Sequence, residues 1–208
     1  MNAYLIRRSS NLVLLAFILM TGKMQAQTTF MIHEFNLIYR GEFKPRLSLK
    51  ADHWFTDRLA FNSYFYATPN WSEGDVGIGY QVANWAYVGC MVGIQNEGDH
   101  LMRIMPNFYL VKGNFSLLGL FGHGIGTDTD RFALQFFYNF GSFKVGAEGI
   151  KEFTIRALGP RFDYTLVDAP SIHLWAAPYY DFTYDKYAAM FGLYAIFGSI
   201  SPKETLFD

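Results

Sequence analysis

The 208-residue sequence has few charged residues. Lys, Arg, Asp and Glu make up 17% of it, where a soluble domain has roughly a quarter, and the net charge is −1. Because the chain has no basic excess, it has no field that would attract nucleic acid. Nucleic acid is therefore excluded as an expected partner.

Cysteine is almost absent, since Cys90 is the single one. An internal disulfide is impossible, and the CxxC and CxxH spacings of structural zinc sites do not occur. The five histidines form no HExxH motif, and no close pair on one strand face has metal-ligand spacing. We expect no metal and no other cofactor.

Long apolar runs are missing after residue 26, so no transmembrane helix is expected in the rest of the chain. The one earlier run, Leu12 to Met20, follows Arg7 and Arg8 and is too short to span a membrane. We predict a secretory signal peptide over residues 1–26, cleaved near Ala26, and a single mature domain over 27–208. Twin-arginine export, or an N-terminal helix kept in the mature fold, are the alternatives.

What the chain does have is aromatic residues, at 19%, and an alternation of apolar and polar residues with period two. The stretch 131–140 is typical: its apolar face holds Phe132, Leu134, Phe136, Tyr138 and Phe140, and Arg131, Gln135 and Asn139 lie between. Glycines recur inside such runs, where each weakens a helix by about 1 kcal/mol relative to alanine. The pattern predicts an all-β protein.

Turn signals divide the chain into about twelve strands, with ten or fourteen as alternatives. The expected strands are 30–43, 45–55, 58–68, 75–83, 85–95, 100–111, 114–124, 131–140, 143–152, 154–166, 171–182 and 187–198. Most have the length of roughly 9–11 residues that a tilted strand needs to cross a bilayer. Longer polar connections alternate with tight turns, which predicts a transmembrane antiparallel up-and-down β-barrel.

The apolar face is expected to meet lipid rather than a buried core. A one-residue slip of strand 45–55 would move Arg46, Lys50 and Asp52 into the bilayer, at about 2–4 kcal/mol for each basic residue. Strands 85–95 and 114–124 are apolar on both faces, so the sequence leaves their orientation open. Aromatic residues near the tight turns predict a girdle at the membrane boundary: Trp54, Phe55, Trp85, Phe115, Phe140 and Phe143.

These features resemble the small porin-like β-barrels of the Gram-negative outer membrane, over essentially the whole mature chain. The resemblance is one of pattern and rests on no family motif. It implies location in the outer membrane and contact with outer-membrane lipid. From the residues themselves we expect no catalytic site. Twelve-stranded members of this class include nucleoside and sugar-acid channels and a phospholipase, so the class alone leaves the activity open.

The polar face is expected to line the lumen. Fourteen charged residues are candidates for it: Glu34, Arg40, Glu42, Arg46, Lys50, Asp52, Arg58, Arg103, Arg131, Lys144, Glu148, Arg161, Asp163 and Asp181. The chief ones are Arg46, Lys50, Asp52, Arg103, Arg131, Glu148, Arg161 and Asp163. We predict a passive channel for small hydrophilic solutes, selected by these charges. A structural barrel with a plugged lumen, or a membrane enzyme that modifies envelope lipid, are the alternatives.

Two weaker patterns suggest other chemistry. Ser171 and His173 share the polar face of one strand, but positions i and i+2 stand roughly 7 Å apart, so catalysis would need a partner from a neighbouring strand. His123 with Asp128 and Asp130 suggests a cation site in a loop, although turn chemistry favours aspartate there without any ion.

Overall fold

The computed structural model describes residues 28–39, 42–69, 71–96, 101–126, 130–152, 155–168 and 170–198. The expected signal peptide and the C-terminal tail after residue 198 lie outside these residues. None of the described residues belongs to a helix long and apolar enough to cross a membrane. That finding does not bear on crossing by strands.

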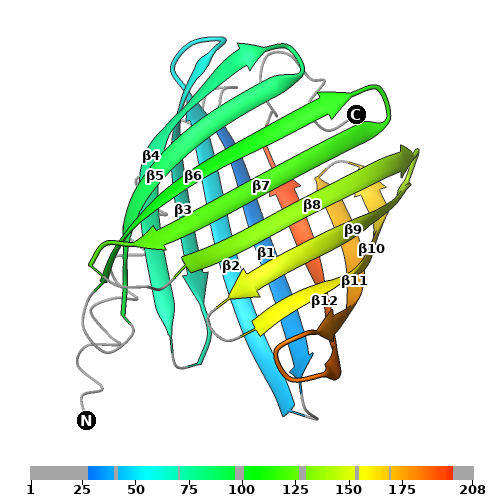
Figure 1. Ribbon diagram of the computed structural model, residues 1–208. Coiled ribbons are helices and arrows are strands. Elements are labelled where there is room, and N and C mark those ends of the chain that lie inside the picture. The colour runs from blue at the N-terminus through cyan, green and yellow to red at the C-terminus, as the bar shows by residue number, and fades with distance from the viewer. Residues whose placement is uncertain are drawn as a thin grey trace.

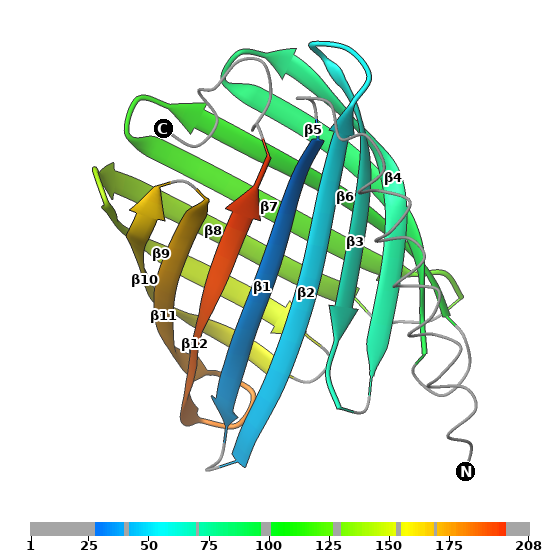
Figure 2. The same cartoon turned by 180° about the vertical axis from the view of Figure 1, so that it is seen from behind.

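Twelve antiparallel strands close into a barrel in which each strand pairs with its neighbours in sequence and β1 pairs with β12 (Figures 1 and 2). The prediction of twelve strands in an up-and-down barrel is confirmed. Their bounds are β1 Thr28–Tyr39, β2 Glu42–Trp54, β3 Leu59–Ala67, β4 Ser72–Ala83, β5 Ala86–Gln95, β6 Leu101–Lys112, β7 Phe115–Gly124, β8 Asp130–Phe140, β9 Phe143–Glu152, β10 Ile155–Asp168, β11 Ser171–Asp181 and β12 Lys186–Phe197.

Up-and-down connectivity divides the connections between two rims. We call the rim with the turns 55–58, 84–85, 113–114, 141–142 and 169–170 the turn rim, and β1 starts and β12 ends there. The opposite rim is the loop rim and carries the connections 68–71, 96–100 and 125–129. The longer polar connections therefore lie together at one end, as the alternation in length predicts.

The barrel is apolar outside and polar inside. Large apolar side chains on the outward face are strongly exposed, as in Ile78 at 60% and Phe140 at 63%. Inward-facing neighbours such as Asp75 and Arg103 are buried. The apolar surface that the described side chains form on the outward face is far larger than the few hundred Å² that soluble monomers expose. The outward face is built to contact lipid.

The structure shows which faces of β5 and β7 point into the barrel, a question that the sequence left open. Along β5, Tyr87, Met91 and Gln95 are buried inside the barrel, while Val88 and Cys90 are exposed outside. Along β7, Gly122 faces inward, because a Cβ there would lie 3.4 Å from the Arg103 Nη1 atom and from Met105. Cys90 is thus a lipid-facing side chain.

One expectation of orientation is wrong. Trp54 was expected in the outer aromatic girdle, but it is 5% exposed and packs inside the barrel against Ala60 and Tyr87. Phe55, Trp85, Phe115, Phe140 and Phe143 are exposed beside the turn rim, as predicted.

Four prolines lie inside strands, although a closed barrel has no free edge for a missing N–H. The pairing of β2 with β3 begins at Leu47 and so leaves out Pro45. The pairing of β6 with β7 stops at Ile104 and resumes at Asn107, and so passes over Pro106. That of β10 with β11 stops at Leu158 and resumes at Phe162, which leaves Pro160 and Pro178 in the same gap. The ladder is interrupted where the donor is missing, and Gly159–Pro160 is part of β10 and not a turn.

Candidate functional site

An ion pair crosses the lumen near the loop rim. Arg131 Nη1 on β8 donates to Glu73 Oε2 on β4 at 2.9 Å. Three strands lie between β4 and β8 in the wall, so this contact must pass through the interior. The Arg131 guanidinium also lies over the rings of Tyr66, 4.7 Å from its centroid, and Trp71, at 5.7 Å. We call this set the Arg131 bridge.

Further polar side chains surround the bridge. Asp75, Gln95 and Arg103 are at most 2% exposed and face the same part of the lumen. Gly93, between Asp75 and Arg103 in the sheet, provides the space, because a Cβ there would overlap the Asp75 carboxylate. Glu73 and Asp75 balance the charges of Arg103 and Arg131, so this part of the lumen is close to neutral.

A second charged cluster lies on the wall formed by β8 to β11. Arg161 Nη1 donates to Glu148 Oε2 at 3.1 Å, and its Nε donates to Asp163 Oδ1 at 3.4 Å. The Trp175 ring centroid is 4.1 Å from the guanidinium carbon. Glu148 also accepts from Gln135 Nε2 at 2.6 Å and from the Tyr179 hydroxyl. These several hydrogen bonds offset the desolvation that a buried ion pair suffers.

Aromatic packing connects opposite walls at the same height. Tyr66 and Trp71 belong to one buried cluster with Ala177 and Tyr179 of β11 and Met190 of β12. Three strands separate β3 from β11 in the wall, so this cluster also spans the interior. Tyr66 and Ala177 have no exposed surface and Tyr179 has 2%. Side chains therefore close most of the lumen near the loop rim.

The half near the turn rim is more open to water. Lys50 Nζ lies 2.8 Å from Asp52 Oδ2, and their side chains keep 40% and 19% of their surface exposed. The lumen residues Asn139 and Lys144 are also partly exposed. On the adjoining wall, Asn62 donates to Asp52 and accepts from the Tyr87 hydroxyl, at 2.6 and 2.7 Å. This half has the form of a polar vestibule.

The eight chief lumen candidates all lie on the inner face. Arg103, Arg131, Glu148, Arg161 and Asp163 belong to the buried clusters, Lys50 and Asp52 to the vestibule, and Arg46 donates to the Tyr66 hydroxyl at 2.7 Å. Their role in transport stays a prediction.

Among the other candidates, Arg58 lies in the exposed turn 55–58 and not in the lumen. Arg40 lies outside the described residues, as does the side chain of Glu34, whose backbone pairs with the outward positions Leu47 and Leu193.

Glu73, Asp75 and Gln95 were missed from the sequence. The stretch 69–75 is rich in turn-forming residues and was assigned to a loop, whereas β4 begins at Ser72. The signal was present, because Glu73 and Asp75 keep the same alternation as Gly77 and Gly79 on the less apolar face.

The distance expected between Ser171 and His173 is wrong. Ser171 Oγ lies 2.6 Å from His173 Nε2, and Thr165 Oγ1 on β10 lies 3.0 Å from His173 Nδ1. Backbone spacing separates the Cβ atoms, but the imidazole bends along the strand and closes the gap. The group faces the lumen, as predicted, and lies away from the membrane lipid.

The loop pattern around His123 brings its imidazole into contact with a carboxylate. His123 Nδ1 lies 2.8 Å from Asp130 Oδ1, and Lys151 Nζ lies 3.6 Å from Asp130 Oδ2. Asp128 lies outside the described residues. Across the part of the chain that the structure describes, no group of three His, Cys, Asp or Glu residues is arranged to hold a metal ion.

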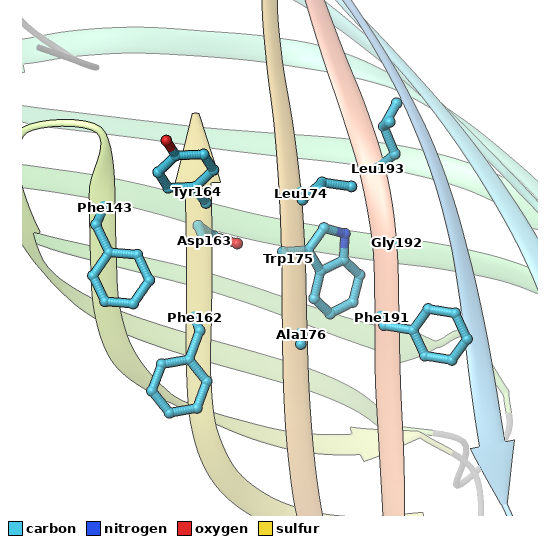
Figure 3. Close-up of a pocket in the computed structure, with 10 residues that line it drawn as sticks. All are labelled: Phe143, Phe162, Asp163, Tyr164, Leu174, Trp175, Ala176, Phe191, Gly192 and Leu193. Carbon is cyan, nitrogen blue, oxygen red and sulfur yellow. The ribbon is translucent and has the colours of Figure 1, made fainter. Parts of the chain in front are cut away.

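The outer wall carries two shallow grooves. One, of about 460 Å³, lies between β9 and β12 and is lined on its outward side by Phe143, Phe162, Leu174 and Phe191 (Figure 3). The other, of about 420 Å³, lies on β8 to β10 towards the loop rim. Both face lipid and neither belongs to the lumen.

Comparison with solved structures places the fold in a known class. The chain is similar to the KdgM porin, with a TM-score of 0.56 and 10% identity over 83% of this chain and 99% of that one. It is similar to the NanC porin, with a TM-score of 0.53 and 7% identity over 82% and 100%. For outer membrane phospholipase A from Escherichia coli the TM-score is 0.51, with 12% identity over 83% and 90%. The chain is a twelve-stranded β-barrel and shares its fold with these porins and this phospholipase.

No protein-family model and no curated protein sequence matches the chain. At these identities the likeness to solved structures extends to the fold only. The activity has to be argued from the lumen itself.

Proposed function

We propose that the barrel is a passive channel for small polar solutes in the outer membrane of a Gram-negative cell. The observation that carries the proposal is the contrast between the two faces. Among the described side chains the outward face is mainly apolar, while the inner face holds charges of both signs, including the partly exposed Lys50 and Asp52 of the vestibule. Such a lining matches the lumen of a channel, where charged side chains select among solutes.

The Arg131 bridge gives this channel its constriction. A solute that enters from the turn rim meets the vestibule first and then the buried groups around Arg131, Glu73 and Tyr66. Because the bridge crosses the lumen, its side chains set the smallest width, and their charge sets the barrier for ions. We expect a narrow channel of low conductance, with passage coupled to movement of these side chains.

Planar-bilayer recording of the purified barrel tests the proposal. Discrete conductance steps are expected, and Arg46→Glu should shift the ion selectivity towards cations, because Arg46 projects into the lumen. Arg58→Glu is the matched control, since it makes the same charge change in an exposed turn outside the lumen. A barrel that inserts and gives no steps, or equal selectivity in both variants, would reject the channel.

A specific observation supports a second function, a structural barrel with a permanently closed lumen. The aromatic cluster around Tyr66 and Tyr179 is almost wholly buried, which fits a plug as well as a constriction. The two functions differ in the effect of removing Arg131. A constriction should widen and pass more current, whereas a plug held by the whole cluster should stay silent.

Enzymatic action on envelope lipid is not part of the proposal. Ser171 and His173 are hydrogen-bonded, but they lie inside the barrel, on the face that lipid does not reach. Incubation of the barrel with labelled phospholipid is expected to leave the lipid intact, and Ser171→Ala should leave channel conductance unchanged. Lipid release that Ser171→Ala abolishes would overturn this view.

A further inference from the structure

The groove on β8 to β10 has an apolar floor and walls. Gly149 forms part of its floor, and Phe132, Phe136 and Leu158 form its sides. A Cβ on Gly149 would meet only Leu158 and Phe132, at 3.6 and 3.9 Å, so the floor is open towards lipid. A volume of about 420 Å³ is enough for a segment of an acyl chain.

Two basic side chains close the end of this groove at the loop rim. Lys151 on β9 and Arg156 on β10 pair directly across the sheet and both line the groove. Like charges placed opposite each other in a sheet repel. Lys151 has a partial partner in Asp130, at 3.6 Å. Arg156 makes no ion pair with any residue of the described ranges, and it is exposed. The local charge is therefore positive.

The height of these cations matches the edge of a bilayer. Lys151 is eight residues along β9 from Phe143, which lies at the turn rim. At about 3.4 Å per residue and a tilt of roughly 40°, this separation is roughly 20 Å along the membrane normal. The apolar band of such barrels is about 25 Å tall, so the backbone at Lys151 and Arg156 lies roughly 5 Å inside its far edge. Their long side chains can extend over this distance to the level of the lipid headgroups.

The groove in Figure 3 provides an internal contrast. It has a similar volume and aromatic walls, but no basic residue lines it. The cations are thus not a general property of grooves on this wall. They distinguish the groove on β8 to β10 from the groove in Figure 3.

We propose that Lys151, Arg156 and the apolar groove beneath them form a binding site for one phosphate-bearing anionic lipid. We call this site the basic groove: Phe132, Phe136, Gly149, Leu158, Lys151 and Arg156. One acyl chain lies over Gly149 between the aromatic side chains. The phosphate lies between Lys151 and Arg156, where it removes their mutual repulsion and gives Arg156 a partner. The site lies on the outer wall and is separate from the lumen. This proposal therefore depends on the barrel lying in a membrane, and it does not depend on whether the barrel conducts ions.

Native mass spectrometry of the full barrel in detergent tests the site, with phosphatidylglycerol and phosphatidylcholine of identical acyl chains as the probes. Phosphatidylglycerol should bind more tightly. Each of Lys151→Gln and Arg156→Gln should weaken its binding about five-fold, which corresponds to about 1 kcal/mol per cation. Each change should weaken the binding of phosphatidylcholine less, because its choline cation offsets the charge of its phosphate. Lys112→Gln, which removes an exposed cation at the other rim, is the matched control.

A second variant tests the groove by itself. Gly149→Leu fills the floor and should reduce the binding of both lipids, while Gly74→Leu, at another outward glycine with open space, should not. Resistance of each folded variant to unfolding in unheated SDS shows that the barrel is intact. Equal binding of the two lipids to the parent, or unchanged phosphatidylglycerol binding in the Lys151→Gln/Arg156→Gln double variant, would overturn the proposal.

Discussion

Removal of Arg131 tests both the closure of the lumen and its energetics. In Arg131→Ala the Glu73 carboxylate loses its partner, and no part of its side chain is exposed to water. At 2.9 Å and an effective dielectric constant of about 20, the gross attraction between the two charges is about 6 kcal/mol. Much of it is offset by desolvation, but the orphaned charge that remains gives an expected loss of about 3–5 kcal/mol in the free energy of unfolding.

The double variant Glu73→Gln/Arg131→Met removes both charges of the pair together, so neither is left without the other and most of the stability should return. Comparison with Arg131→Ala shows how much of the lost stability comes from leaving one buried charge alone. Lys50→Ala is the matched control, because the pair of Lys50 with Asp52 is partly exposed and contributes below about 1 kcal/mol. Urea unfolding of the barrel in lipid vesicles, followed by tryptophan fluorescence, measures all three.

Conductance provides the second measurement. Arg131→Ala should raise the single-channel conductance and shift selectivity towards cations, since it removes a bulky positive charge from the opening. The double variant should raise conductance without the same shift, because Glu73 is neutral there. If Arg131→Ala unfolds at the same urea concentration as Lys50→Ala and conducts like the parent, the Arg131 bridge neither holds nor narrows the lumen.

Three further predictions concern the wall. Leu134→Arg places a cation near mid-bilayer and should cost about 2–4 kcal/mol in unfolding experiments, whereas Gln135→Arg, on the inner face, should cost less; equal losses would refute the assigned faces. Gly159→Ala should weaken the barrel, because its Cβ would overlap the Pro178 carbonyl of β11, and Gly149→Ala should not; a gel of unheated samples compares the folded fractions. Cys90 faces lipid, so a membrane-impermeant maleimide should label it only after unfolding, and rapid labelling of the folded barrel in vesicles would contradict that orientation.

Most of the wall was predictable because period-two patterns act on each strand separately. Leu134 and Gln135 show why. The apolar residue assigns one face to lipid and its polar neighbour assigns the other face to the lumen. A one-residue shift in register would exchange the two faces, at a large cost in free energy. The same logic fails in β5 and β7, where both faces are apolar, and there only pairing with neighbouring strands decides. It also fails for Trp54, since an aromatic residue near a turn suits either the girdle or the lumen.

The contacts across the lumen were not predictable. The alternation of apolar and polar residues along β8 predicts that Arg131 points inward. Which of the eleven other strands it contacts depends on the closed shape of the barrel. Glu73 was hidden further by its position in a stretch of turn-forming residues. Ser171 and His173 show a related limit, because a distance between Cβ atoms says little about where two side chains end.

The Arg131 bridge has a mechanical consequence. It ties β8 to β4 along a chord of the barrel, while the hydrogen-bonded wall between them follows the arc. A change of the barrel cross-section from round to oval must therefore lengthen or shorten the contact between Arg131 and Glu73. Pressure from the surrounding bilayer and the width of the aperture thus act on one and the same contact.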